Sequence, residues 1–215
     1  MKNKILITIM VVLALAASVI WYLVATPDQQ QVETAQLGTP SATKQEPAVN
    51  NSTYASLEGD ALDEAYIADM LAHHEAALNM AEQAQAVTAH NEIRTLAGNI
   101  IQTQSQEMMN MRTWQVEWGY EATTSGGHMS HGGGGADMAG DMVEMQNKLR
   151  DLTGEAYDKE FLIQMIIHHE QAVEMSRYVA TKALHPELKD LASAVISAQT
   201  AEINQMKQWQ KDWGY

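Results

Sequence analysis

The chain contains no cysteine among its 215 residues, which excludes disulfide bonds and thiolate metal sites. Any soft metal ion must therefore be bound through methionine thioethers. Phenylalanine is almost absent as well, since the sequence has 1 Phe but 14 Met. Cores normally use Leu, Ile, Val and Phe, with Met as a gap-filler, so this excess of thioethers calls for a reason besides packing.

Positive charge is also scarce. Lys and Arg total 13 against 27 Asp and Glu, which gives a formal net charge of −14. An acidic surface without a basic stripe repels phosphate backbones, so we expect no nucleic-acid partner. The sequence also shows no nucleophile triad, phosphate loop or nucleotide fingerprint, and we expect a protein that is not an enzyme.

The N-terminal residues 1–25 read as an export or anchoring segment. Lys2 and Lys4 precede an uncharged apolar run over 5–25, which is close to membrane-spanning length. Trp21 lies near its far end, where aromatic side chains favour the membrane interface. We favour an uncleaved inner-membrane anchor, with cleavage at 16–18 as the alternative. Either way, the positive-inside rule predicts a periplasmic or other extracytoplasmic location.

Two segments lack a long periodic pattern. Residues 26–56 are rich in Gln, Thr, Ala, Pro and Asn and predict a flexible linker. Residues 121–153 begin with a Gly-rich stretch that is incompatible with a helix, and this stretch carries His128, Met129 and His131. A short amphipathic helix follows within this segment, with one apolar face formed by Met138, Met142, Met145, Leu149 and Leu152.

The remaining sequence is an internal repeat, which we place at 57–120 and 154–215. Without any gap, Gly59 aligns with Gly154 and Tyr120 with Tyr215, and about a third of the paired positions are identical. An ungapped match of this length indicates duplication of one structural unit.

Each copy predicts two helices joined by a tight turn. The first helices span about 60–86 and 155–183, and the second begin near Asn91 and Pro186. Gly119 and Gly214 follow the last apolar residues, as glycines beyond a helix C-terminus do. Two such hairpins predict an all-α fold, an antiparallel four-helix bundle with a short extra helix between the repeats.

The first helix of each copy carries a Met-x-x-His-His motif followed by another methionine. Its residues are Met70, His73, His74 and Met80 in the first copy and Met165, His168, His169 and Met175 in the second. The spacing places Met70, His73 and Met80 on one helical face, with His74 at its edge.

The second helices carry a matching seam. It contains Gln104, Glu107 and Met111, paired with Gln199, Glu202 and Met206 in the second copy, and only the first copy adds Met108. We expect the two seams to face each other, with the Gln and Glu side chains supporting the metal ligands. The tryptophans of these helices are expected to be core anchors.

Thioethers prefer Cu(I) or Ag(I), and imidazole binds both Cu(I) and Cu(II), so mixed Met and His sites suit copper in an oxidising compartment. A Met stripe at helical spacing is also what ordinary core packing produces, and adjacent histidines are often one core and one solvated residue. Three features favour metal binding: the motif recurs, the Met excess extends beyond the bundle, and cysteine is absent.

On these residues the sequence resembles a bacterial family defined by a domain of unknown function, with a Met-x-x-His-His core and a Trp-Gly end. The resemblance covers 59–120 and 154–215. It implies a ferritin-like helical bundle that binds Cu(I), with Cu(II) and Ag(I) as further ions, and a role in copper tolerance.

We therefore favour a copper-binding protein that sequesters the ion or hands it to an exporter or a periplasmic copper sensor. Besides the bundle residues, a flexible acquisition site is expected, formed by His128, Met129, His131, Met138, Met142 and Met145. One alternative is a di-iron enzyme, but neither copy contains the Glu-x-x-His motif that such enzymes use. Another is a metal-free interaction module at the membrane.

Overall fold

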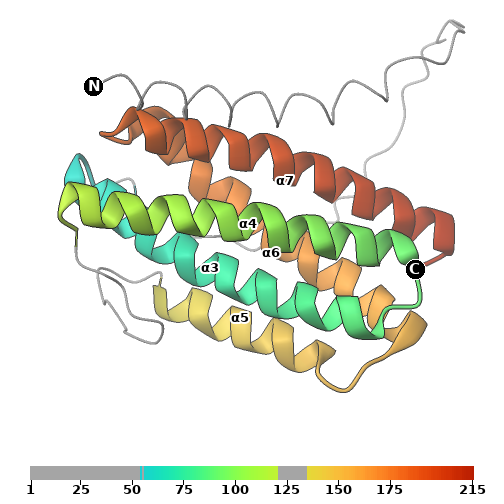
Figure 1. Cartoon of the computed structure of the whole chain (residues 1–215). Coiled ribbons are helices and arrows are strands. Elements are labelled where there is room, and N and C mark those ends of the chain that lie inside the picture. Colours follow the sequence, from blue (N-terminus) through green and yellow to red (C-terminus); the bar gives the residue numbers. More distant parts are fainter. Residues whose placement is uncertain (1–53, 55, 121–134) are drawn as a thin grey trace, which may run out of the picture. The chain divides into compact units, whose positions relative to one another are not determined.

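The computed structural model describes Tyr54, residues 56–120 and residues 135–215. These residues belong to one compact unit, Gln45–Tyr215. They form five helices, shown in Figure 1: α3 (Asp60–Val87), α4 (Asn91–Trp118), α5 (Gly135–Leu149), α6 (Gly154–Lys182) and α7 (Pro186–Trp213). The fold is the predicted antiparallel four-helix bundle of two hairpins, α3–α4 and α6–α7, with α5 as the extra helix.

The helices end where the sequence places their stop signals. Gly119 and Gly214 adopt the left-handed conformation, with φ of 78° and 74°. The next residue in each copy, Tyr120 or Tyr215, then donates its N–H back to a carbonyl of the last turn. A residue with a Cβ is strained in this conformation, which explains the glycine at both positions. Pro186 occupies the start of α7, as expected.

Helices α3 and α6 form the centre of the bundle and run antiparallel to each other. The ring of His73 contacts the ring of His168, while Tyr66, near the start of α3, bonds Ser176, near the end of α6. Because His73 and His168 are equivalent in the two repeats, their contact marks an approximate two-fold axis. Helix α4 packs on α3 and α7 on α6 (Figure 1).

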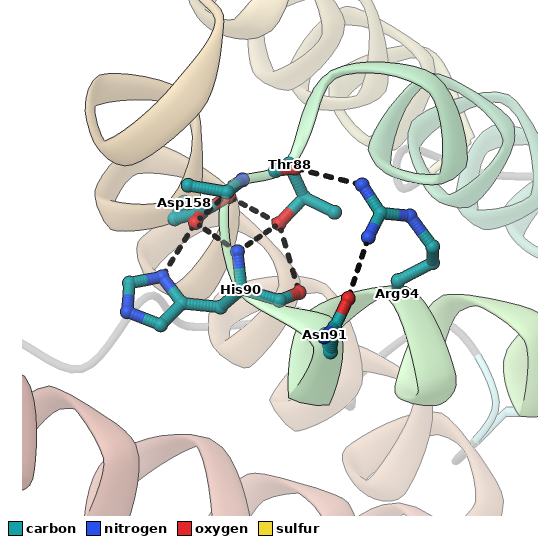
Figure 2. Close-up of polar contacts among 6 residues, drawn as sticks. Thr88, His90, Asn91, Arg94 and Asp158 are labelled. Atoms are coloured by element: carbon teal, nitrogen blue, oxygen red, sulfur yellow. Dashed lines mark hydrogen bonds and ion pairs between the residues drawn. The ribbon is translucent and has the colours of Figure 1, made fainter.

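Each hairpin turn is held by a buried aspartate from the other repeat. Figure 2 shows Asp158 of α6 directed at the α3–α4 turn, where it accepts bonds from the Thr88 hydroxyl, the His90 N–H and His90 Nδ1. Its counterpart Asp63 accepts bonds from the Leu184 N–H, the His185 N–H and His185 Nδ1. Both carboxylates are fully buried, so the two repeats complete each other's turns.

Aromatic stacking also links the two repeats at these two turns. The ring of Trp213 stacks on His90 at 3.8 Å, and the ring of Trp118 stacks on His185 at 3.7 Å. Each tryptophan therefore covers a histidine of the other repeat. The tryptophans are half-buried and contact the edges of the core, in line with the expected anchoring role.

Helix α5 packs across α3 and α6. Met142, Met145 and Leu149 are buried in the core, while Gln83 of α3 donates a hydrogen bond to the Leu149 carbonyl. The predicted amphipathic face is thus the packing face of this helix.

One boundary differs from the expectation. The linker predicted over 26–56 includes Tyr54, whose ring is 4% exposed and belongs to the core. A large aromatic side chain gains enough from burial to order the chain at this point, although the residues around it are polar.

Within the described ranges, no helix is both long and apolar enough to cross a membrane. The segment 1–25, which carries the predicted anchor, lies outside those ranges.

We predict that Asp158→Ala lowers the free energy of unfolding by about 3 kcal/mol, because it leaves the N–H groups of Ala89 and His90 and the side chains of Thr88 and His90 without their buried acceptor. Asp63→Ala should have a similar effect at the other turn. Urea denaturation measures both. Asp151→Ala, at an exposed position, serves as the control and should change stability by less than about 0.5 kcal/mol. Equal losses in all three variants would contradict the assignment.

Candidate metal centre

Four histidines meet where α3 crosses α6. His73, His74, His168 and His169 all have 0% relative exposure. The rings of His73 and His168 lie 3.6 Å apart between centroids, and His168 Nε2 donates to the His73 carbonyl oxygen at 3.0 Å. The sequence left open which of the two adjacent histidines faces inward, and the structure buries both.

The second histidine of each motif is oriented by a glutamate from the neighbouring helix. His74 Nε2 lies 2.8 Å from a carboxylate oxygen of Glu107, and His169 Nε2 lies 2.7 Å from one of Glu202. These pairs confirm that the two seams of each hairpin face each other. A carboxylate that fixes one ring nitrogen as the donor leaves the other as a lone pair, which is how metal-binding imidazoles are commonly oriented.

Several polar atoms in this centre have no hydrogen-bond partner. Among the described residues these include both ring nitrogens of His73 and the Nδ1 atoms of His74, His168 and His169. Unpaired buried polar atoms cost free energy and are rare in proteins, so each one needs an explanation. A bound ion is one explanation for nitrogens that carry lone pairs.

The protonation state of the central pair suits such a role. Burial lowers the pKa of His73 and of His168 well below the ordinary value of 6.5, and the neighbouring imidazoles lower it further. Both rings are therefore neutral at physiological pH. A neutral imidazole keeps the lone pair that a metal ion requires.

The predicted thioethers are buried on both sides of the histidines, in two clusters. The α5-side cluster contains Met80, Met142, Met145, Met165 and Met206. The Tyr54-side cluster contains Met70, Met108, Met111 and Met175.

One methionine of each repeat packs with methionines of the other repeat. Met80 of the first repeat joins Met165 and Met206 of the second, while Met175 joins Met70 and Met111. The first-helix face predicted as one seam is therefore divided between two clusters, because α3 and α6 cross at the histidines.

Two further predicted residues, Gln104 and Gln199, are buried, and the Oε1 atom of each has no hydrogen-bond partner. They lie on the second helices with the two glutamates, as expected for supporting groups. Met108 is buried on the same helix as Gln104, and the second repeat has Ile203 at the equivalent position. The repeats are thus unequal in donors, as the sequence indicates.

The expected flexible acquisition site is not assembled in the described residues. His128, Met129 and His131 lie outside them. Met142 and Met145 are core residues of α5, and Met138 is half-buried against the core, so these methionines do not form an exposed flexible segment. Their function as metal ligands stays a prediction.

In the part of the chain that the structure describes, no three His, Asp or Glu side chains are grouped as ligands of one ion. The glutamates pair with histidines instead of with each other. A site here would have to combine imidazole nitrogens with thioethers, which is the mixture that favours copper and silver.

The sequence interpretation missed two groups of residues. The aspartate–histidine pairs at the turns recur in both copies at Asp63, His90, Asp158 and His185, so the repeat itself carried a signal for them. Tyr54 and its partner Asp69 carried none, because the tyrosine stands in a polar segment and the aspartate has Gln164 as its counterpart.

Comparison with known proteins identifies similar chains. The family described as "Domain of unknown function (DUF305)" matches residues 63–210. The structure is similar to that of CopM in its Cu(II)-bound form, at 34% identity and a TM-score of 0.57, covering 70% of this chain and 98% of CopM. Structures of CopM in the Cu(I)-bound and silver-bound forms match at 33% identity, with TM-scores of 0.56 and 0.57.

Two further matches are one solved structure, which shares the fold, and one sequence relative. A DUF305 protein from Streptomyces coelicolor, described as secreted, is 24% identical with a TM-score of 0.59 over 71% of this chain and 93% of its own. An uncharacterised protein of Acanthamoeba polyphaga mimivirus is 41% identical over 49 residues, which span 23% of this chain and 32% of that protein. The match thus covers about a third of this curated relative.

The buried histidines predict a dependence of stability on pH. The unfolded chain takes up protons on His73 and His168 below about pH 6.5, whereas the folded chain does not, so acidification favours unfolding. In the metal-free protein this contribution should reach about 2.7 kcal/mol per pH unit for the pair.

Urea denaturation between about pH 7 and pH 5 measures this slope. The variant with His73→Gln and His168→Gln should lose stability more gently on acidification than the wild type. Identical slopes in the two proteins would show that the central histidines do not remain neutral in the fold.

Proposed function

The chain belongs to the DUF305 family, and on that premise we propose that it is a copper-binding protein of the cell's extracytoplasmic space. It binds Cu(I) through the Met and His side chains of the bundle centre, and also accepts Ag(I) and Cu(II). It sequesters the ion or hands it on, and thereby contributes to copper tolerance.

The observation that carries this proposal is the set of five unpartnered ring nitrogens on the four buried histidines. A bundle stabilised only by packing would place apolar side chains at these positions, because an unpaired buried polar atom costs about 1–3 kcal/mol. Instead, each repeat places two histidine rings here, and the four rings lie between two thioether clusters.

The donor chemistry favours labile binding of soft ions. Thioethers and neutral imidazoles carry no charge, so they hold Cu(I) less tightly than thiolates do and can release it to a partner. The carboxylates of Glu107 and Glu202 lie beside the outer histidines and would offset part of the positive charge of a bound ion. The overall charge of −14 also raises the local concentration of cations.

The similarity to CopM supports the same ion. CopM has structures with Cu(I), Cu(II) and silver bound, and 70% of this chain, including the bundle, aligns with it. The set of ions matches the one that mixed Met and His donors prefer.

We assign a binding function without catalysis, with a copper exporter or a periplasmic copper sensor as the receiving partner. The segment 1–25 would hold the bundle at the outer face of the inner membrane, since two lysines precede its long apolar run.

Competition with a chromophoric Cu(I) chelator tests the function directly. We predict that the full chain withdraws Cu(I) from the chelator, and that the variant His73→Gln/His168→Gln binds at least about tenfold more weakly, because it loses two nitrogen donors. The near-isosteric set Met70→Leu, Met80→Leu, Met165→Leu and Met175→Leu should weaken binding similarly while the bundle stays folded.

The matched control is His90→Gln/His185→Gln, which removes two histidines at the turns, away from the centre. It should bind Cu(I) as the wild type does. Binding that survives in both centre variants would move the site to the loop that carries His128 and His131. If the wild type does not compete with the chelator at all, the copper function is wrong and the methionines are packing residues.

A further inference from the structure

Tyr54 brings a phenol oxygen into the Tyr54-side cluster of thioethers. Its hydroxyl lies 2.6 Å from Asp69 Oδ2 and 3.8 Å from Met175 Sδ. A phenol has one proton, which can bond only one acceptor at a time. The carboxylate is the closer acceptor, and the same phenol oxygen also contacts the thioether sulfur.

The other repeat lacks these oxygens. Tyr54 and Leu149 occupy equivalent places, since each accepts a bond at 3.0 Å from the leucine three residues later in the chain, Leu57 or Leu152. The counterpart of Asp69 is Gln164, whose amide donates to Glu160. At the equivalent positions the other half of the bundle therefore has an aliphatic side chain and an amide in place of the phenol and the carboxylate.

We propose that Tyr54 and Asp69 add oxygen donors for Cu(II) at Met175, on one flank of the Met and His centre that binds Cu(I). This inference rests on the proposed copper function and names the side chains that Cu(II) would use in addition to the thioether. Two oxygens and one thioether are a harder donor set than thioethers alone, and Cu(II) takes oxygen ligands that Cu(I) does not favour.

The separations suit ligands of one ion. With bonds of about 2.0 Å to oxygen and about 2.3 Å to sulfur, neighbouring ligands lie roughly 3–3.5 Å apart. The distances of 2.6 and 3.8 Å reach this range with small side-chain movements. Asp69 is only partly buried, which gives the ion a route from solvent.

Charge balance also favours a divalent ion here. Binding follows Cu²⁺ + Tyr–OH → Cu–O–Tyr⁺ + H⁺, in which the phenol proton leaves to solvent and no electron moves. The Asp69 carboxylate, 2.6 Å from the phenol oxygen, supplies a negative charge that a cation between the two oxygens would balance.

Visible absorption of the full chain titrated with Cu(II) tests the site. A coordinated phenolate gives a ligand-to-metal charge-transfer band that imidazole and thioether ligands do not reproduce. We expect this band in the wild type and its loss in Tyr54→Phe, together with at least about tenfold weaker Cu(II) binding. Cu(I) binding of Tyr54→Phe should equal that of the wild type.

Tyr66→Phe is the matched control, because Tyr66 is also a buried tyrosine with a bonded hydroxyl, and its partner is Ser176. It should keep the band, as should Tyr157→Phe, whose hydroxyl bonds the Met80 carbonyl. Circular dichroism confirms that all variants are folded.

The outcomes separate the two proposals. A wild type that binds Cu(I) but shows no phenolate band with Cu(II), or a band that persists in Tyr54→Phe, overturns the Cu(II) site alone. A wild type that fails to bind Cu(I) overturns the proposed function whatever the band shows.

Discussion

The contact between His73 and His168 is the constraint on which the rest of the structure depends. Two neutral imidazoles 3.6 Å apart require α3 and α6 to cross closely at this point, which places every equivalent pair of residues symmetrically about it. The exchange of Asp63 and Asp158 between the turns follows from this crossing. So does the exchange of Met80 and Met175 between the two clusters.

The histidine centre lowers the stability of the bundle, because it buries polar atoms that have no hydrogen-bond partner. Well-packed cores avoid such atoms. The bundle compensates at its ends, where buried carboxylates accept backbone and imidazole donors from the opposite repeat. Local violations of packing rules that are offset elsewhere are typical of functional sites. Hydrogen-bonded polar groups therefore lie at the turns, and polar groups without partners lie at the histidine centre.

The duplicated repeat has diverged within one symmetric frame. In one half, the Tyr66 hydroxyl bonds Ser176, while the equivalent positions hold Phe161 and Ala81, which are both buried. Paired changes of this kind keep volume and hydrogen bonding consistent on each side. The result is one flank with oxygen donors near Met175 and another with thioethers of α5 near the core. The approximate two-fold symmetry of the fold is thus compatible with two different chemical environments beside the histidine centre.

The sequence by itself determined the helices, the repeat and the shared face of Met70, His73 and Met80, because helical periodicity, terminal glycines and the Met-x-x-His-His spacing act over a few residues. The pairing of His74 with Glu107 was also within its reach, since the two seams recur in both copies. Only the tertiary structure decided that both adjacent histidines are buried and that Tyr54 belongs to the core. It also decided that Met80 and Met175 each pack with methionines of the other repeat. These outcomes depend on how α3 crosses α6, and contacts between residues far apart in the chain leave no local pattern to read.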